Sequence, residues 1–367
     1  MNSSGTTKTA HPFYIKLPMI LLSIYLIGYL AIQGKEFLSP FIIAFLFAIL
    51  LLPVANFLER RLKFSRSLAT FTSLFILLGL LVLLLYLLGS QLSTVAGDWP
   101  LFKAQLLHSI ESARAWLSQN FHIDSKKQVS YIQDATSKII SSSTEILGTT
   151  FISASSLLLF LVFILIYCFF LLFYRRLIVQ FLVRVFKEEH KSVVQDILEQ
   201  VQYIIRGYLS GLLLEMLLVS VACCLTFWIL GIRYAVLLGL IVGVFNIVPY
   251  IGIFSALLIS TVITFASGAA LTTVGLVALS VIVIHLIDSN FLLPVIVGSK
   301  VRINALMTIA GVIIGEMMWG ISGMFLSIPI VAILKIIFDR VDGLQPWGML
   351  LGEDAMTKKK RKLIKRA

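Results

Sequence analysis

The chain has 367 residues, of which 59% are hydrophobic and 13% are charged, and its mean hydropathy is +0.99. Soluble proteins carry roughly 25% charged residues, so this composition excludes a water-soluble protein and predicts an all-α, polytopic helical membrane protein. The net charge of +12 comes largely from cationic loops and a cationic tail. Such clusters are typical of membrane topology and of contact with anionic lipids, so we expect no nucleic-acid partner.

Six apolar runs are long enough to cross a membrane as single helices, because a bilayer core needs about 20 apolar residues. They cover residues 14–33, 37–58, 68–92, 151–174, 207–230 and 271–293. The first ten residues are polar and lack the pattern of a cleaved signal peptide, so the first run is expected to remain as a span. Lys and Arg cluster after the second and fourth runs and in the tail, which predicts that both termini are cytoplasmic.

Two segments are predicted to be helical without crossing the membrane. Residues 97–150 contain two amphipathic patterns, over about 102–117 and 129–140, and are expected to form a small helical cap outside the membrane. An apolar stripe over 188–206 predicts a separate amphipathic helix on the cytoplasmic side. The expected organisation is N-terminal spans over 1–96, an extracytoplasmic helical segment over 97–150, a span with the amphipathic helix over 151–206, a C-terminal transport core over 207–345 and a basic cytoplasmic tail over 346–367.

Two apolar stretches in the last third of the chain, 234–266 and 303–338, are too long for single spans and contain Gly and Pro. Each is expected to divide into two pieces of roughly 15–17 residues, which are too short to span alone. This brings the total to about eight membrane segments. Paired, interrupted segments of this kind point to a transporter's binding site. The positions expected to shape the backbone there are Pro249, Gly252, Pro294, Gly315, Gly320 and Pro329.

A basic pair between these stretches, Lys300 and Arg302, bears on their topology. If both stretches are re-entrant hairpins, the pair lies in the cytoplasm, and if both are single spans, it lies outside. Because basic loops are retained in the cytoplasm, the pair favours hairpins.

Polar side chains inside apolar runs are energetically costly and therefore mark candidate functional residues. The densest group is His285, Asp288 and Asn290. His285 and Asp288 share a helical face, and Pro294 is expected to end their helix. The group could bind a polar solute or a cation, or relay a proton. Alternatively, Asp288 serves only as a hydrogen-bonding group across the bundle.

Three further residues complete the candidate site. Glu316, in the second broken stretch, either faces Asn246 and Asp288 or caps backbone amides at the break. Glu215 is alone in its span and either takes part in transport or pairs with Arg206. Asn246 is short enough to satisfy free backbone groups at the first break. The three cysteines have no metal-ligand spacing, and the chain has no nucleotide-binding loop or HExxH motif. We therefore expect no metal, no cofactor and no enzymatic activity.

Four motifs in the C-terminal half resemble those of a known family. They are Gly231–Gly239, Asn246–Gly252, Asp288–Pro294 followed by Gly298, and Gly320–Pro329. In this order they are similar to the AI-2E transporter family, also called the autoinducer-2 exporter or PerM-like permease family. The resemblance covers nearly the whole chain, and Glu316 fits a Gly-Glu-x-x-x-Gly pattern of one branch. It implies an eight-segment permease of the bacterial inner membrane, with activities that include autoinducer-2 export and sodium(lithium)/proton antiport.

We therefore expect a secondary transporter that exports a small polar solute, such as autoinducer-2, with protons carried by Asp288 or Glu316. Sodium(lithium)/proton antiport is the close alternative, and a passive channel and a membrane scaffold are two others. The expected partners are the solute or a monovalent cation, protons and membrane lipids. Small residues on several helix faces also make a homo-oligomer an expected assembly.

Overall fold

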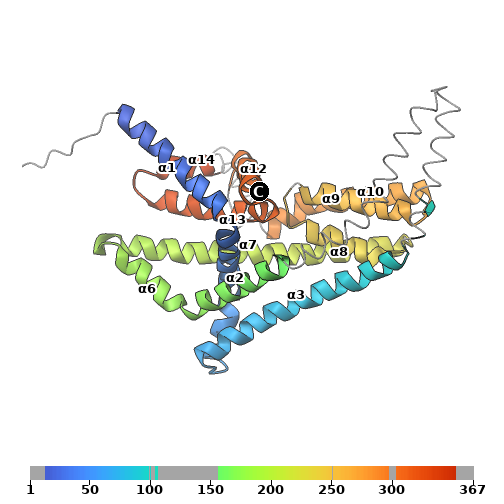
Figure 1. Ribbon diagram of the computed structural model, residues 1–367, viewed down its shortest axis with the longest axis horizontal. Coiled ribbons are helices and arrows are strands. Elements are labelled where there is room, and N and C mark those ends of the chain that lie inside the picture. Colours follow the sequence, from blue (N-terminus) through green and yellow to red (C-terminus); the bar gives the residue numbers. More distant parts are fainter. Residues whose placement is uncertain are drawn as a thin grey trace, which may run out of the picture.

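The computed structural model describes residues 13–98, 100, 104–105, 156–249, 251–296 and 303–352. All regular structure in these ranges is helical (Figure 1). Six of the described helices are long and apolar enough to cross a membrane: Lys35–Arg60, Arg66–Val95, Ser156–Phe173, Glu188–Ile229, Leu271–Ile296 and Ile321–Arg340. The predicted all-α, polytopic membrane protein is thus confirmed. Most of the expected cap over 97–150, together with Lys300, Arg302 and the basic tail after position 352, lies outside the described residues.

The N-terminal helices follow the predicted spans closely. They are α1 (Phe13–Gln33), α2 (Lys35–Arg60), α3 (Arg66–Gly97) and the helix Ser156–Phe173. Apart from Lys16 near the start of α1, their long apolar runs lack internal charges, so nothing in the sequence ends them before the flanking polar residues. An apolar cluster joins α2 and Ser156–Phe173 to α7 (Glu188–Ile229) and α13 (Ile321–Arg340). This cluster is the first of two around which the molecule is built.

Helices α6 (Arg175–Val185) and α7 (Glu188–Ile229) follow. The amphipathic helix and the span expected at 188–206 and 207–230 are one continuous helix of 42 residues. At 1.5 Å per residue α7 is about 63 Å long, roughly twice the thickness of a bilayer core. The helix continues because one buried face runs through the junction, from Val201 and Ile205 to Leu209 and Leu212. A glycine inside a helix destabilises it by only about 1 kcal/mol, so Gly207 alone does not end a helix that is packed in this way.

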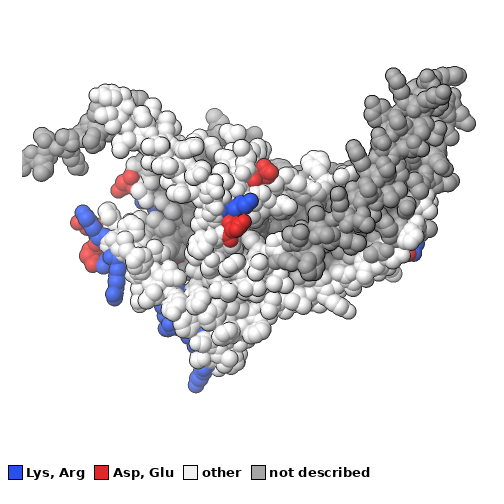
Figure 2. Space-filling view, viewed as in Figure 1, with Lys and Arg blue, Asp and Glu red and all other residues white. Residues whose placement is uncertain are grey.

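Charged side chains are unevenly distributed over the surface. Figure 2 shows many of them at the end formed by α6 and the start of α7 and at the turn between α2 and α3, with a smaller mixed group near the centre of the view and white surface over much of the rest of the described part of that face. At this end Arg175 Nη2 contacts Glu59 Oε1 at 2.6 Å, and the side chains of Arg175 and Glu59 are only 12% and 11% exposed. The cationic clusters after the second and fourth runs, which the sequence predicts to be cytoplasmic, are therefore near each other, whereas the cluster in the tail lies outside the described residues.

The first broken stretch is a helical hairpin alongside the C-terminal half of α7 (Figure 1). Helix α8 (Ala235–Phe245) has 11 residues and is shorter than predicted, whereas α9 (Ile251–Ala266) has 16. A methyl group on Gly252 would overlap the carbonyl group of Phe245, so only glycine allows α9 to begin this close to the end of α8. With α10 (Leu271–Ile287) they form the second apolar cluster, which includes Val219, Leu238 and Val281.

The prediction that Pro294 ends its helix is wrong. The chain continues from α10 through a π-helical turn, η1 (Asp288–Leu292), into α11 (Leu293–Ile296). The N–H of Leu293 donates to the carbonyl oxygen of Asp288, five residues earlier. Pro294 has no N–H to donate to residue 290 and its ring crowds that carbonyl group, so a wider turn replaces a break. Single π-turns of this kind occur frequently at functional sites.

The second broken stretch bends at one position only. Helices α12 (Ala305–Trp319) and α13 (Ile321–Arg340) meet at Gly320, whose φ of +64° favours glycine, and α14 (Gln345–Leu351) follows. Gly315 and Gly323 lie in contact, which makes α12 and α13 a tight antiparallel hairpin. Gly315 therefore packs helices together and does not break one. Pro329 lies inside α13, which has 20 residues, and does not break it either.

Candidate functional site

Three predicted site residues meet at the centre of the C-terminal half. Asn246 Nδ2 donates hydrogen bonds to Glu215 Oε1 at 3.1 Å and to Asp288 Oδ2 at 3.0 Å. Glu215 and Asp288 are each only 2% exposed. The structure thus brings together two buried carboxylates and one bridging amide from α7, from the end of α8 and from η1. We call Glu215, Asn246 and Asp288 the carboxylate triad.

Close packing of α8 on α7 brings Asn246 within reach of Glu215. A methyl group on Gly243 would lie 2.7 Å from the carbonyl oxygen of Met216 and would overlap the side chain of Ser220. Gly239 is in similarly close contact with Cys224. Because these two glycines lack side chains, α8 approaches α7 next to Glu215, and Asn246 follows one turn after Gly243.

The triad lies between the two apolar clusters. On α7, Leu212 belongs to the first cluster and Val219 to the second, and Glu215 lies between them. Asp288 opens the π-turn, which packs against α7. The carboxylates therefore have apolar packing on both sides along α7, where electrostatic interactions are stronger than in water.

Several buried polar atoms of this region have no hydrogen-bond partner among the described residues. They are Glu215 Oε2, Asp288 Oδ1 and His285 Nδ1. A buried polar atom without a partner is energetically unfavourable, and a proton on either carboxylate would give its oxygen a hydrogen to donate. His285 is three residues before Asp288 in the chain and makes no hydrogen bond to the triad in the described residues. Oxygen atoms from two carboxylates suit a hard cation. No group of three or more His, Cys, Asp or Glu side chains that could hold a metal ion is found in the described part of the chain.

Two other predicted residues lie apart from the triad. Asn290 is exposed and donates to the carbonyl oxygen of Leu286 at 2.8 Å. Glu316 is exposed on α12, which packs against α13, α1 and α2. The second break therefore does not join the first. Its tip contacts the junction of α1 and α2, where Trp319 Nε1 donates to the carbonyl oxygen of Ala31 at 2.9 Å.

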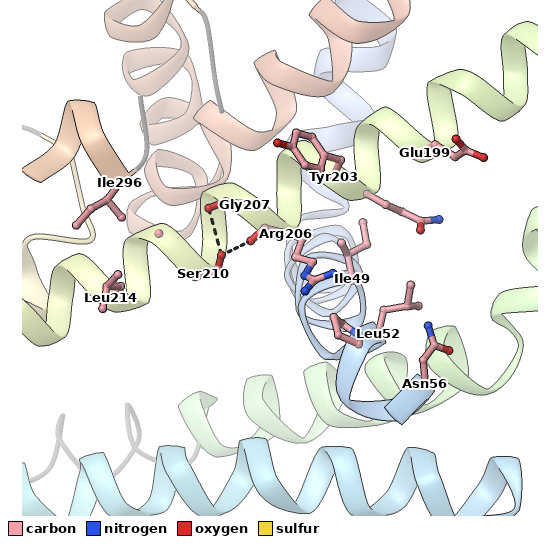
Figure 3. A pocket seen from close by; sticks show the side chains of 13 residues that line it. Ile49, Leu52, Asn56, Glu199, Tyr203, Arg206, Gly207, Ser210, Leu214 and Ile296 are labelled. Carbon is pink, nitrogen blue, oxygen red and sulfur yellow. Dashed lines mark hydrogen bonds between the residues drawn. The ribbon is translucent and has the colours of Figure 1, made fainter. Parts of the chain in front are cut away.

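A pocket of about 780 Å³ opens between α2 and α7 (Figure 3). It is lined by Ile49, Leu52, Pro53, Asn56, Glu199, Gln202, Tyr203, Arg206, Gly207, Ser210, Gly211, Leu214 and Ile296. Sequence reasoning missed this pocket. The signal was present in the polar residues of α7, which recur at helical spacing from Glu199 through Arg206 to Ser210. Glu215 does not pair with Arg206, because its hydrogen bond is to Asn246.

A second polar cluster, also missed, joins α3 to the turn between α7 and α8. Tyr234 donates its hydroxyl hydrogen to Asp98 Oδ2, and Arg233 Nη2 lies 2.9 Å from the same oxygen. Burial, and then the hydrogen bond to Asp98, raise the pKa of Tyr234 to about 12. The phenol is thus neutral at physiological pH and remains a donor, so the cluster holds these two elements together.

Comparison with known proteins gives a consistent result. The family model described as "AI-2E family transporter" matches residues 17–343. The AI-2 transport protein TqsA of Escherichia coli (strain K12) is 26% identical over 328 residues, which cover 87% of this chain and 90% of TqsA. YrrI of Bacillus subtilis, provisionally named a transport protein, is 34% identical over 133 residues, which cover 35% of this chain and 36% of YrrI.

PerM of Escherichia coli (strain K12), provisionally named a permease, is 25% identical over 148 residues, which cover 40% of this chain and 42% of PerM. The matches to YrrI and PerM thus cover less than half of either relative. The family match extends from α1 to the end of α13, and so it includes the whole carboxylate triad. This chain belongs to the AI-2E transporter family.

Proposed function

We propose that this protein is a secondary transporter of the bacterial inner membrane, with both termini in the cytoplasm, and not an enzyme. It exports a small polar solute, such as autoinducer-2, and couples export to protons. Family membership supports transport, and the relative TqsA, named for AI-2 transport, supports the class of solute. The observation that carries the coupling is the carboxylate triad: two buried carboxylates within hydrogen-bonding distance of one amide nitrogen.

The triad supports proton coupling for an electrostatic reason. Two carboxylates this close in apolar packing repel each other strongly when both are charged. A proton on either one removes the repulsion and converts an acceptor into a donor. Binding and release of that proton would therefore change how firmly α7, α8 and η1 are held together.

The elements around the triad suit such a change. The turn after Asn246 and the π-turn at Asp288 are interruptions of regular helix, and interruptions of this kind absorb conformational change at transport sites. We propose that the hairpin of α8 and α9 enters the membrane from one side and returns to it. Its movement against α7 would expose the triad to the two sides in turn.

Sodium(lithium)/proton antiport is the second candidate. It is favoured by the two carboxylate oxygens, Glu215 Oε2 and Asp288 Oδ1, that are buried without partners in the described residues. A monovalent cation could take both as ligands and neutralise the pair as a proton would.

Proton flux in proteoliposomes that contain the purified full chain and a pH-sensitive dye tests both candidates. Autoinducer-2, sodium and lithium are added in separate pulses, to wild type, Glu215→Gln and Asp288→Asn. Glu316→Gln is the matched control, because this carboxylate is exposed and lies apart from the triad. We expect a proton signal on addition of autoinducer-2 that falls at least about tenfold in both triad variants, since a fixed neutral group cannot cycle a proton.

A signal evoked by sodium or lithium and lost in the same variants would establish the antiporter in place of the exporter. Solute flux without proton movement, unchanged in the triad variants, would indicate a passive channel. No flux of any kind with a folded protein would point to a membrane scaffold. Loss of the proton signal in Glu316→Gln alone would move coupling away from the triad.

A further inference from the structure

The pocket between α2 and α7 is lined by both polar and apolar side chains. The polar ones are Asn56, Glu199, Gln202, Tyr203, Arg206 and Ser210. The apolar residues are Ile49, Leu52, Leu214 and Ile296. Gly207 and Gly211 keep space open on the surface of α7. The volume of about 780 Å³ lies in the range of small-molecule sites. It far exceeds what an inorganic ion needs.

Arg206 gives the pocket a positive charge. Its side chain forms no ion pair with any carboxylate in the described residues. Figure 3 shows it extending from α7 toward α2 beside Ile49, with Glu199 well apart on α7. Glu199 also lines the pocket, seven positions before Arg206 in α7, which corresponds to about 10 Å along the helix axis. The guanidinium group therefore faces the cavity without a direct ion pair to this carboxylate.

Neighbouring donors suit the same kind of ligand. Asn56 Oδ1 accepts a hydrogen bond from Arg175 Nη2 at 3.1 Å. This fixes the amide orientation and leaves the amide N–H groups of Asn56 as donors. Ser210 donates to backbone carbonyl oxygens of its own helix, so its hydroxyl hydrogen is already used and Asn56 is left as a neighbouring side-chain donor for the ligand. A planar guanidinium with an amide donor nearby is well suited to a carboxylate or phosphate group.

We propose that this pocket binds a small organic anion, with its carboxylate or phosphate on Arg206 and its carbon skeleton against the apolar side chains of the lining. Leu214 lines the pocket and directly precedes Glu215 in α7, so the pocket reaches the turn of α7 that carries Glu215, although no residue of the carboxylate triad lines it. The inference rests on the proposed function, because it assigns the pocket as the cytoplasmic approach for the transported solute and names that solute as anionic.

Equilibrium dialysis measures this binding without transport. The full chain in phosphatidylcholine nanodiscs is dialysed against labelled succinate, inorganic phosphate or erythritol, an uncharged four-carbon polyol. We expect saturable binding of succinate, weaker binding of phosphate and no saturable binding of erythritol. Arg206→Gln should weaken succinate binding at least about tenfold, because the charge-assisted contact is lost. Succinate binding by Arg206→Lys should be intermediate between that of wild type and that of Arg206→Gln. Arg184 is an exposed arginine on α6, so Arg184→Gln should bind succinate as wild type does.

A second measurement does not depend on the choice of anion. Ser210→Cys is treated with an anionic or a cationic methanethiosulfonate reagent, and the rates are corrected for the native cysteines with the unsubstituted chain. We expect the anionic reagent to react faster. Adding Arg206→Gln should lower the ratio of anionic to cationic rates about tenfold, the effect of one nearby charge at intermediate dielectric.

Each result has a defined meaning. Equal rates for the two reagents, or a ratio unchanged by Arg206→Gln, would overturn the proposal. So would binding of erythritol equal to that of succinate, or displacement of succinate by phosphatidylglycerol in the nanodiscs, which would assign Arg206 to a lipid headgroup. Anion binding that persists in Asp288→Asn while proton flux is absent in every protein would support the pocket and refute the proposed coupling. Proton-coupled flux of a neutral solute, unaffected by Arg206→Gln, would support the proposed coupling and refute the pocket as a site for an anionic solute.

Discussion

Asp288 Oδ2 accepts a hydrogen bond of 3.0 Å from Nδ2 of Asn246, which lies 42 residues earlier in the chain. The same nitrogen also donates to Glu215. One amide therefore connects two acidic residues that would otherwise face each other unbridged. Asn246 is at the tip of a hairpin and Asp288 is in a π-turn, so the two interruptions in this part of the chain meet at the two carboxylates.

Replacing Asn246 with Leu tests the bridge. The substitution leaves Glu215 and Asp288 without their shared donor, and each loss of a buried partner costs about 1–3 kcal/mol. We expect a lower unfolding temperature of the purified protein, measured by tryptophan fluorescence, and a proton signal in proteoliposomes reduced at least about tenfold.

Asn290→Leu is the control for this substitution. Asn290 lies within the π-turn, but it is exposed, and among the described residues its side chain donates to Leu286 and Ser289. Asn290→Leu should therefore change the unfolding temperature little. Equal effects of the two substitutions would mean that the bridge contributes nothing specific.

The apolar runs made much of the fold predictable. Spans such as 37–58 and 68–92 appear as α2 and α3 with ends shifted by only a few residues, because hydrophobic length alone decides them. Glu215, Asn246 and Asp288 were all predicted as site residues, since a polar group in an apolar run needs a partner. Their direct contact was not predicted.

What the sequence left open depends on close tertiary contacts. Gly243 reads as an ordinary helical glycine until its neighbour Met216 is known, and this contact brings Asn246 to Glu215. Gly315 and Pro329 resemble breaks, yet packing keeps both inside helices. Glu316 stands in a promising motif, but α12 packs against α1, α2 and α13 and leaves it exposed. Patterns along one chain do not contain such distances.

Gly243→Ala tests the close approach of α8 to α7. The added methyl would lie 2.7 Å from the carbonyl oxygen of Met216, so α8 must move away. We expect destabilisation of about 1–3 kcal/mol from overpacking and reduced proton flux as Asn246 loses Glu215. Gly275→Ala on α10 is the matched control, because no atom lies within 4 Å of the position of its methyl. It should be neutral or stabilising by up to about 1 kcal/mol, and equal destabilisation by both would contradict the argument.

Arg175 and Arg176 provide a paired test of the ion pairs around Glu59. Both contact Glu59, at 2.6 Å and 3.3 Å, but their side chains are 12% and 62% exposed. Arg175→Gln removes the largely buried positive charge that offsets the burial of the Glu59 carboxylate. It should lower the free energy of unfolding by about 3 kcal/mol. Arg176→Gln should cost less than about 1 kcal/mol, as exposed pairs do. Unfolding in a denaturing detergent series measures both, and a larger effect of Arg176→Gln would show that the burial of Arg175 is not what matters.

The contacts of Tyr234 and Arg233 with Asp98 differ in strength, and two substitutions measure the difference. Tyr234→Phe removes a buried hydrogen bond to a carboxylate and should cost about 1.5–3 kcal/mol. Arg233→Gln removes an ion pair whose arginine is 51% exposed, so it should cost less than about 1 kcal/mol.

The folded pKa of Tyr234, about 12, lies above its ordinary value of 10.0. The contribution of the phenol to stability is therefore fully present below pH 10 and is lost as the pH rises toward 12. Unfolding temperatures of wild type and Tyr234→Phe should consequently converge over this range, whereas a constant difference would mean that the phenol's proton does not stabilise the fold.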